Sequence, residues 1–139
     1  MQARMTLALL ATLTLAACDS SSPETPGPLM AGANSPIADV PVPIGFKLQE
    51  GKSYAQVTGP LRFVKYYYVG RESTLPVVKF FKDNMPLNKW DFVSQDGPAN
   101  EMTLKFTKSN EDCVIVIQGG SMHTKVWINI DPTGRNGPK

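Results

Sequence analysis

The sequence has few of the residues that build metal sites and disulfides. Of 139 residues only two are cysteines, Cys18 and Cys113, and the single histidine is His123. A disulfide between the two cysteines would join an N-terminal leader to a predicted core strand, so we expect them to be chemically unrelated. One histidine without a cluster of further ligands argues against a zinc site. We therefore predict no metal and no cofactor.

The chain also lacks an excess of charge of one sign. Fourteen basic residues face twelve acidic ones, which gives a formal net charge of +2. Proteins that bind nucleic acid usually gather their basic residues into a patch or stripe. Here the lysines stand singly between acidic and apolar positions. Nucleic acid is therefore not an expected partner.

No hydrophobic run is long enough to span a bilayer, which takes about 20 residues. The longest uncharged apolar stretch, Met5 to Leu15, follows Arg4 at the N-terminus. A short positive start followed by such a stretch is typical of a signal peptide. We assign residues 1–17 to this leader.

The leader ends in Leu15-Ala16-Ala17-Cys18, which resembles the lipobox of bacterial lipoproteins. The resemblance implies cleavage before Cys18, a thioether-linked diacylglycerol on its sulfur, and further acylation such as palmitate. The protein would then be a lipoprotein of the cell envelope, held by lipid on the extracytoplasmic or periplasmic side of a membrane. Asp19 is similar to the residue that keeps enteric lipoproteins in the inner membrane, but inner and outer membrane both stay open.

Two other interpretations of this segment remain. One is an ordinary secretory leader that is cleaved after Ala17, and the other is a buried N-terminal helix in which Cys18 is incidental. The charged start, the small residues and the abrupt change of composition after Cys18 favour the lipoprotein.

Composition divides the rest of the chain. Residues 18–43 are rich in Ser, Pro and Gly without any apolar periodicity, and we predict a disordered tether there. Residues 44–130 should form one globular domain, and the turn-rich residues 131–139 a flexible tail.

Apolar periodicity predicts the secondary structure of the domain. Gly59-Pro60 separates two extended stretches, and Ser73 or Thr74 can cap a helix from Leu75 to Met85. The period then changes to two in four further strands, which are Trp90 to Ser94, Met102 to Phe106, Cys113 to Ile117 and Val126 to Ile130. We predict an α+β fold, with an antiparallel sheet of about five or six strands and one helix packed on one face.

The stretch Val77 to Trp90 is similar to a motif of small bacterial domains of unknown function. In that group a helix with a paired aromatic ends in a proline, and a Gly-Trp precedes the strands. Phe80-Phe81, Pro86 and Trp90 match, whereas Lys89 stands in place of the glycine. The group has no activity to carry over, so the resemblance informs the fold alone.

No constellation of residues points to catalysis. Ser121, His123 and Asp112 could be combined into a triad, but no nucleophile motif frames the serine, and turns collect such residues anyway. Cys113 heads an apolar strand and is expected to be a buried, inert thiol. We predict no catalytic residues, with an envelope enzyme that uses a cleft near His123 as the alternative.

One surface is a candidate for binding. The predicted alternation places Tyr66, Tyr68 and Trp127 on the uncovered face of the sheet, where Lys105 and Lys125 can join them. Such a patch suits an envelope protein, peptide or glycan. The main hypothesis is therefore a non-enzymatic, membrane-anchored binding or assembly module, and a passive surface lipoprotein is a further alternative.

Overall fold

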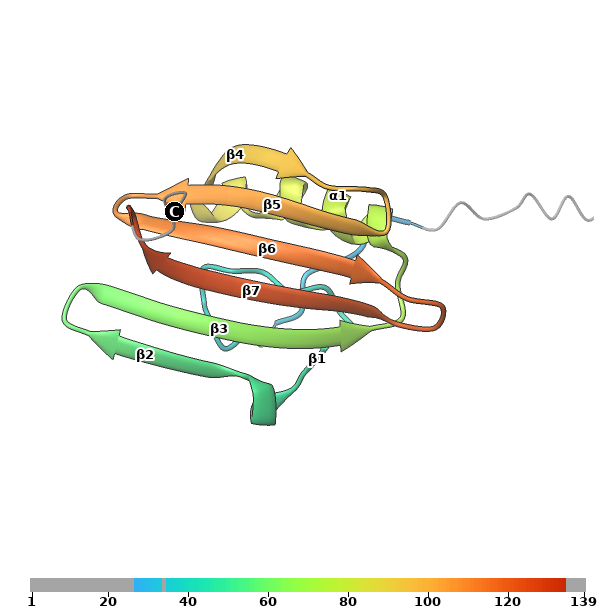
Figure 1. Ribbon diagram of the computed structural model, residues 1–139, viewed down its shortest axis with the longest axis horizontal. Coiled ribbons are helices and arrows are strands. Elements are labelled where there is room, and N and C mark those ends of the chain that lie inside the picture. Colours follow the sequence, from blue (N-terminus) through green and yellow to red (C-terminus); the bar gives the residue numbers. More distant parts are fainter. Residues whose placement is uncertain (1–26, 34, 135–139) are drawn as a thin grey trace, which may run out of the picture.

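The computed structural model describes residues 27–33 and 35–134, which fold into one antiparallel sheet with a single α-helix (Figure 1). In chain order the strands are β1 (Lys47–Leu48), β2 (Tyr54–Thr58), β3 (Leu61–Gly70), β4 (Asp91–Asp96), β5 (Glu101–Lys108), β6 (Glu111–Gly119) and β7 (Thr124–Pro132). Helix α1 (Thr74–Asn84) lies between β3 and β4, and the short 3₁₀ turns are η1 (Glu50–Lys52) and η2 (Pro86–Asn88).

The sheet is larger than predicted. Its strands follow the order β1-β3-β7-β6-β5-β4, and β2 also pairs with β3, so seven strands take part instead of five or six. The extra strand, β1, is only two residues long and too short to show a period in the sequence. The predicted antiparallel sheet with a helix packed on it is confirmed, but the described chain is mainly β.

Helix α1 covers one half of the sheet. Ser73 has the extended backbone of an N-cap residue, and Pro76 fits the first turn because its missing N–H is not needed there. The side chains at helical spacing are buried against β5 and β6; they are Val77, Val78, Phe80 and Phe81, with Met85 just after the helix.

Lys89 takes the conformation that a glycine would adopt. After η2 its φ is 67°, in the left-handed region that L-residues other than glycine rarely occupy. Through this turn the Trp90 N–H donates to the Met85 carbonyl oxygen at 3.2 Å, and the Trp90 side chain is completely buried. Lys89 therefore closes the turn before β4 in a conformation that glycine adopts more readily.

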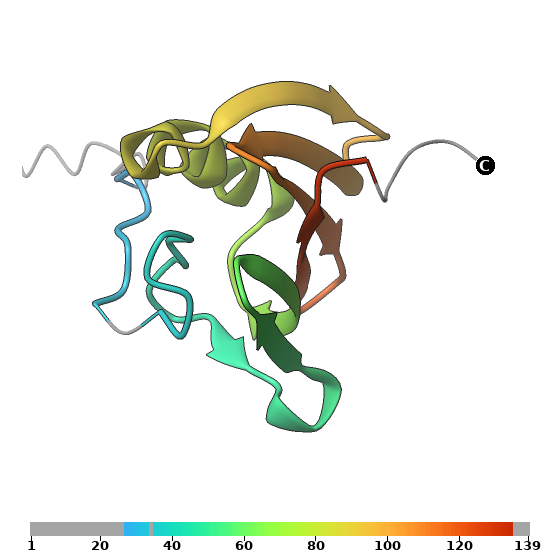
Figure 2. The ribbon, with the colours of Figure 1, turned by 90° about the vertical axis from the view of Figure 1, so that its left-hand side faces the viewer.

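The other half of the same sheet face is covered by residues 27–33 and 35–46, called here the N-terminal segment. Figure 2 shows this segment beside α1 on one side of a strongly curved sheet. Ile37, Val40 and Val42 are buried in the core together with the helix residues. The predicted disordered tether over residues 18–43 is thus wrong for its described part. The eleven-residue helix is too short to cover the whole sheet, and these isolated apolar residues fill the remaining space.

The chain also stays ordered beyond Ile130. Strand β7 runs to Pro132, where Pro132 pairs with Glu111, and the Thr133 N–H donates to the Asn110 carbonyl oxygen at 2.7 Å. The predicted flexible tail over 131–139 is therefore wrong at its start, because β6 is long enough to pair with these residues.

Four charged side chains fasten the N-terminal segment to the sheet; this ionic cluster consists of Asp39, Arg62, Lys108 and Glu111. Arg62 donates to both oxygens of Asp39 at 2.9 and 3.0 Å and also binds Glu111, while Lys108 binds Asp39 at 2.7 Å. Burial alone would raise the pKa of Asp39, but the hydrogen bonds from Arg62 and Lys108 outweigh it and lower this pKa to about 2. Asp39 is therefore held as a carboxylate.

Trp90 connects the ionic cluster to the core. Its indole N–H donates to the Asp39 backbone oxygen at 2.9 Å, and Lys108 Nζ lies 5.4 Å from the centre of its ring. The segment is thus fixed to the sheet by charge, by an indole hydrogen bond and by apolar packing.

Candidate functional site

The face of the sheet opposite α1 and the N-terminal segment carries the candidate site, and we call it the open face. Strand register decides which side chains lie on it. Val64, Tyr66 and Tyr68 of β3 pair with Ile130, Ile128 and Val126, which are buried in the core. The residues between them, including Phe63, Lys65 and Tyr67 on β3 and Lys125 and Trp127 on β7, therefore lie on the open face.

Tyr67 and Trp127 form the centre of this face. They are cross-strand partners, and their rings stack with centroids 4.9 Å apart and an interplanar angle of 26°. Lys52 Nζ lies 5.3 Å from the centre of the Tyr67 ring, which leaves Tyr67 only 7% exposed. Trp127 is half-buried and also pairs with Val116 of β6. The pair is a rigid aromatic platform with one accessible indole.

Three lysines lie on the same face of the sheet as this platform. Lys65 pairs with Asn129, Lys105 with Val114 and Lys125 with Val69 and Gln118, and all three are exposed. Within the described residues none of these three lysines forms an ion pair. Strand register thus brings lysines that are scattered along the sequence onto the same face as one aromatic pair. The same register also places Glu101, Asp112 and Asp131 on this face, so the attraction for a negatively charged group is local to the three lysines.

Two of the three aromatic residues that were predicted for the open face lie on the covered face. Trp127 lies on the open face as predicted, but Tyr66 and Tyr68 lie on the covered face, with ring centroids 6.3 Å apart in an edge contact. Tyr68 is only 3% exposed, and burial raises its pKa to about 12. Its hydroxyl has no hydrogen-bond partner among the described residues.

The error has a simple origin. Tyr66, Tyr67 and Tyr68 follow one another, so their side chains show no alternation, and placing Phe63 in the core puts Tyr66 and Tyr68 on the open face. Tyr67, which was not predicted to belong to the site, occupies the open face in place of its neighbours. Val64 shares the parity of Tyr66 and Tyr68 and is itself buried, so the face of the three tyrosines follows from the structure of β3 and not from its local sequence.

The residues near His123 do not assemble a catalytic set. Ser121 and His123 lie in the exposed turn between β6 and β7, whereas Asp112 lies at the start of β6, roughly 20 Å or more away along the strand. A shallow hollow of about 200 Å³ adjoins this turn. Within residues 27–33 and 35–134 no three His, Cys, Asp or Glu side chains are grouped as metal ligands would be. Cys113 is fully buried, and burial raises its pKa.

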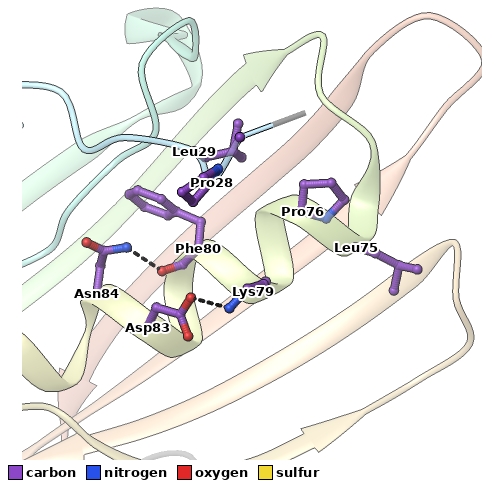
Figure 3. Close-up of a pocket in the computed structure, with 9 residues that line it drawn as sticks. Pro28, Leu29, Leu75, Pro76, Lys79, Phe80, Asp83 and Asn84 are labelled. Atoms are coloured by element: carbon purple, nitrogen blue, oxygen red, sulfur yellow. Dashed lines mark hydrogen bonds and ion pairs between the residues drawn. The ribbon is translucent and has the colours of Figure 1, made fainter. Parts of the chain in front are cut away.

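A groove of about 790 Å³ separates the start of the N-terminal segment from α1. Figure 3 shows Pro28 and Leu29 on one side of it and Leu75, Pro76 and Phe80 on the other. Its polar side chains are already paired, since Lys79 binds Asp83 at 2.7 Å and Asn84 donates to the Phe80 carbonyl oxygen at 2.9 Å. The groove therefore offers an apolar wall without unpaired polar groups to orient a ligand.

No family model matches this chain, and neither the curated proteins nor the solved structures include a significant match to it. The predicted lipidation site, Cys18, lies outside the described residues. Among the residues that are described, no helix has the length and apolar character needed to cross a bilayer.

Proposed function

We propose that the protein is a lipid-anchored module of the cell envelope that binds a negatively charged partner through its open face. Its anchor is Cys18, and the protein acts by binding and not by catalysis. The observation that carries the proposal is that three lysines without ion pairs, Lys65, Lys105 and Lys125, share the open face with the stacked Tyr67 and Trp127.

The position of Gly27 supports this arrangement. Gly27 lines the groove beside α1, on the covered side of the sheet, while the open face points the other way (Figure 2). Only eight residues, 19–26, lie between Cys18 and Gly27. At about 3.3–3.6 Å per residue they reach at most roughly 30 Å. A lipid on Cys18 would thus connect to the domain from its covered side and leave the open face accessible.

The anchor is tested by intact mass spectrometry of the membrane fraction, with Cys18→Ala as the comparison. We expect a chain that starts at Cys18 and carries the mass of a diacylglycerol, and we expect the variant to lose it. An unmodified soluble wild-type chain would refute the anchor. It would leave the proposed binding surface to be tested by itself.

Binding is tested with two defined acidic probes, a polyglutamate peptide and an oligogalacturonate, so that peptide and glycan partners are distinguished. Replacing Lys65, Lys105 and Lys125 together by Gln should weaken binding by roughly tenfold to a hundredfold, because each contact contributes about 0.5–1 kcal/mol. Added salt should weaken wild-type binding as well.

The matched control replaces Lys79, Lys82 and Lys89 by Gln. These lysines are exposed on the covered side, so the net charge changes equally while the open face stays intact. Equal losses in both triple variants would indicate nonspecific charge attraction. Absence of binding to either probe would favour a passive lipoprotein over a binding module.

A further inference from the structure

Within the described residues the sheet has two edges, β1 with β2 on one side and β4 on the other, and of β2 and β4 only β4 is guarded there against pairing with another strand. A bulge interrupts the β4 register between Phe92 and Ser94, and Asp91 and Asp96 place charges at both ends. Lys82 of α1 also reaches β4, donating to Gln95 at 3.1 Å. Bulges and charges are the devices by which proteins prevent edge-to-edge association.

Strand β2 has none of these devices. Its sequence, Tyr-Ala-Gln-Val-Thr from Tyr54 to Thr58, contains no charge and no proline, and its pairing with β3 shows no bulge. All five residues are exposed, with Tyr54 58% and Val57 68% accessible. An uncharged, regular and exposed edge of this kind readily accepts another strand.

The hydrogen bonds of β3 identify which backbone groups of β2 are free. The Tyr67 N–H donates to Ser53 Oγ at 3.0 Å, and the Tyr67 carbonyl oxygen accepts from the Gln49 N–H at 2.8 Å. Both groups of Tyr67 point toward the edge formed by β1 and β2, and by alternation the N–H and carbonyl groups of Lys65 and Phe63 point the same way. Tyr54 and Gln56, which pair with Lys65 and Phe63, therefore direct their own N–H and carbonyl groups toward β3. The N–H and carbonyl groups of Ala55 and Val57 point away from β3, toward the free side of β2.

We infer that β2 pairs with β2 of a second copy of this chain. An antiparallel pairing centred on Gln56 sets Ala55 of each copy opposite Val57 of the other, and each such pair exchanges two hydrogen bonds. Tyr54 meets Thr58 on the open face, and the two Gln56 side chains lie beside each other. The strand is self-complementary about its middle residue, and no like charges meet.

The geometry of this pairing agrees with two copies in one membrane. When two strands pair in a single sheet, the two-fold axis is perpendicular to that sheet, so both open faces point to the same side. Both copies of Gly27 then lie on the opposite side, where two lipid anchors can enter the same bilayer. The pairing itself does not depend on the anchor or on the acidic partner, but it would place two open faces in one surface.

Disulfide trapping tests the inference directly. Gln56→Cys in the full chain places two thiols at a non-hydrogen-bonded pair, where Cα atoms lie about 4.5 Å apart, within disulfide range. Mild oxidation of membranes should give a covalent dimer on a non-reducing gel. Gln95→Cys is the matched control, an exposed glutamine on the guarded edge, and it should stay monomeric. The wild-type chain controls for Cys18 and for the buried Cys113.

A second variant tests the hydrogen bonds. Val57→Pro removes an outward N–H from each copy and leaves the ladder with β3 intact. The dimer dissociation constant, measured by sedimentation in detergent, should therefore rise roughly tenfold or more. Val57→Thr should behave like wild type. Circular dichroism checks that the variant is folded. A wild-type monomer, equal trapping at both edges, or a folded Val57→Pro dimer as tight as wild type would each overturn the inference.

Discussion

The two halves of the covered sheet face are closed by different means. Over β5 and β6 lies α1, whose backbone satisfies its own hydrogen bonds and whose apolar face fills the core. Over β3 lies the N-terminal segment, whose few backbone hydrogen bonds include Gly32 to Val42 at 2.8 Å and Ile44 to Met30 at 2.9 Å. An irregular segment can therefore replace a helix as a cover, provided that a few apolar side chains and a charged cluster hold it in place.

The largest expected effect is on the helical half. Phe81→Ala removes a fully buried ring from the centre of the α1 contact and should lower the free energy of unfolding by about 3–5 kcal/mol. Urea unfolding followed by circular dichroism measures the loss. Because the helix shares one core with the sheet, the helix and strand signals should lose intensity at the same urea concentration. A variant in which the helix signal alone is lost at lower urea would show that the two halves unfold independently.

The ionic cluster makes the stability of the half covered by the N-terminal segment depend on pH. The pKa of Asp39 is about 2 in the folded protein and 3.8 in the unfolded chain, so its contribution is fully present above about pH 4 and is lost as the pH falls toward 2. This pKa shift corresponds to roughly 2 kcal/mol of the free energy of unfolding. Unfolding measured between pH 7 and pH 2 should show this loss, and Asp39→Asn should remove most of it.

Asp83→Asn is the control for this pH series. Asp83 also pairs with a lysine, Lys79, but both side chains are more than half exposed. Exposed ion pairs contribute little to stability. A pH profile that changed as much in this variant as in Asp39→Asn would contradict the role given to the cluster.

A smaller and more local effect is expected at Val40. Val40→Ala removes two buried methyl groups and should cost about 1.5–2 kcal/mol. Since Val40 belongs to the segment and not to the sheet, hydrogen exchange should speed up first at the amides of Gly32 and Ile44. Equal acceleration at the amides of β6 would show instead that the segment and the sheet open as one unit.

The smallest effect concerns the turn that follows the helix. Lys89→Gly removes the left-handed strain at φ 67° and should stabilise the protein by up to about 1 kcal/mol, measured as a rise in Tm. Lys89→Ala keeps the strain and serves as the control. A loss of stability in the glycine variant would mean that the lysine side chain itself contributes to this turn.

The regular elements could be predicted from the sequence because their pattern is local. Leu104, Phe106, Ile115 and Ile117 alternate with polar or exposed positions, and the helix residues recur at helical spacing, so strands and helix followed from period alone. The N-terminal segment has no such pattern. Ile37, Val40 and Val42 stand between prolines, and their burial depends on the space that a short helix leaves over β3 and β7.

The candidate site was predicted only in part, for a related reason. Trp127 lies between Val126 and Ile128, which fixes its face, and the same alternation placed Lys105 and Lys125 on that face as well. The face of each tyrosine in Tyr66-Tyr67-Tyr68 is set by the pairing of β3 with β7, which no local pattern encodes. Lys65 joins the site through the same pairing, and composition gave no sign of it.

The positions of the two tryptophans give the molecule two fluorescent reporters in different environments. Trp90 is completely buried, with its indole N–H on Asp39, and so its emission should be blue-shifted and respond to release of the N-terminal segment. Trp127 is half-buried on the open face, and so external quenchers and ligands should reach it first. Single replacements of either residue by Phe would separate the two signals, so that closure of the core and occupation of the surface can be followed in one unlabelled sample.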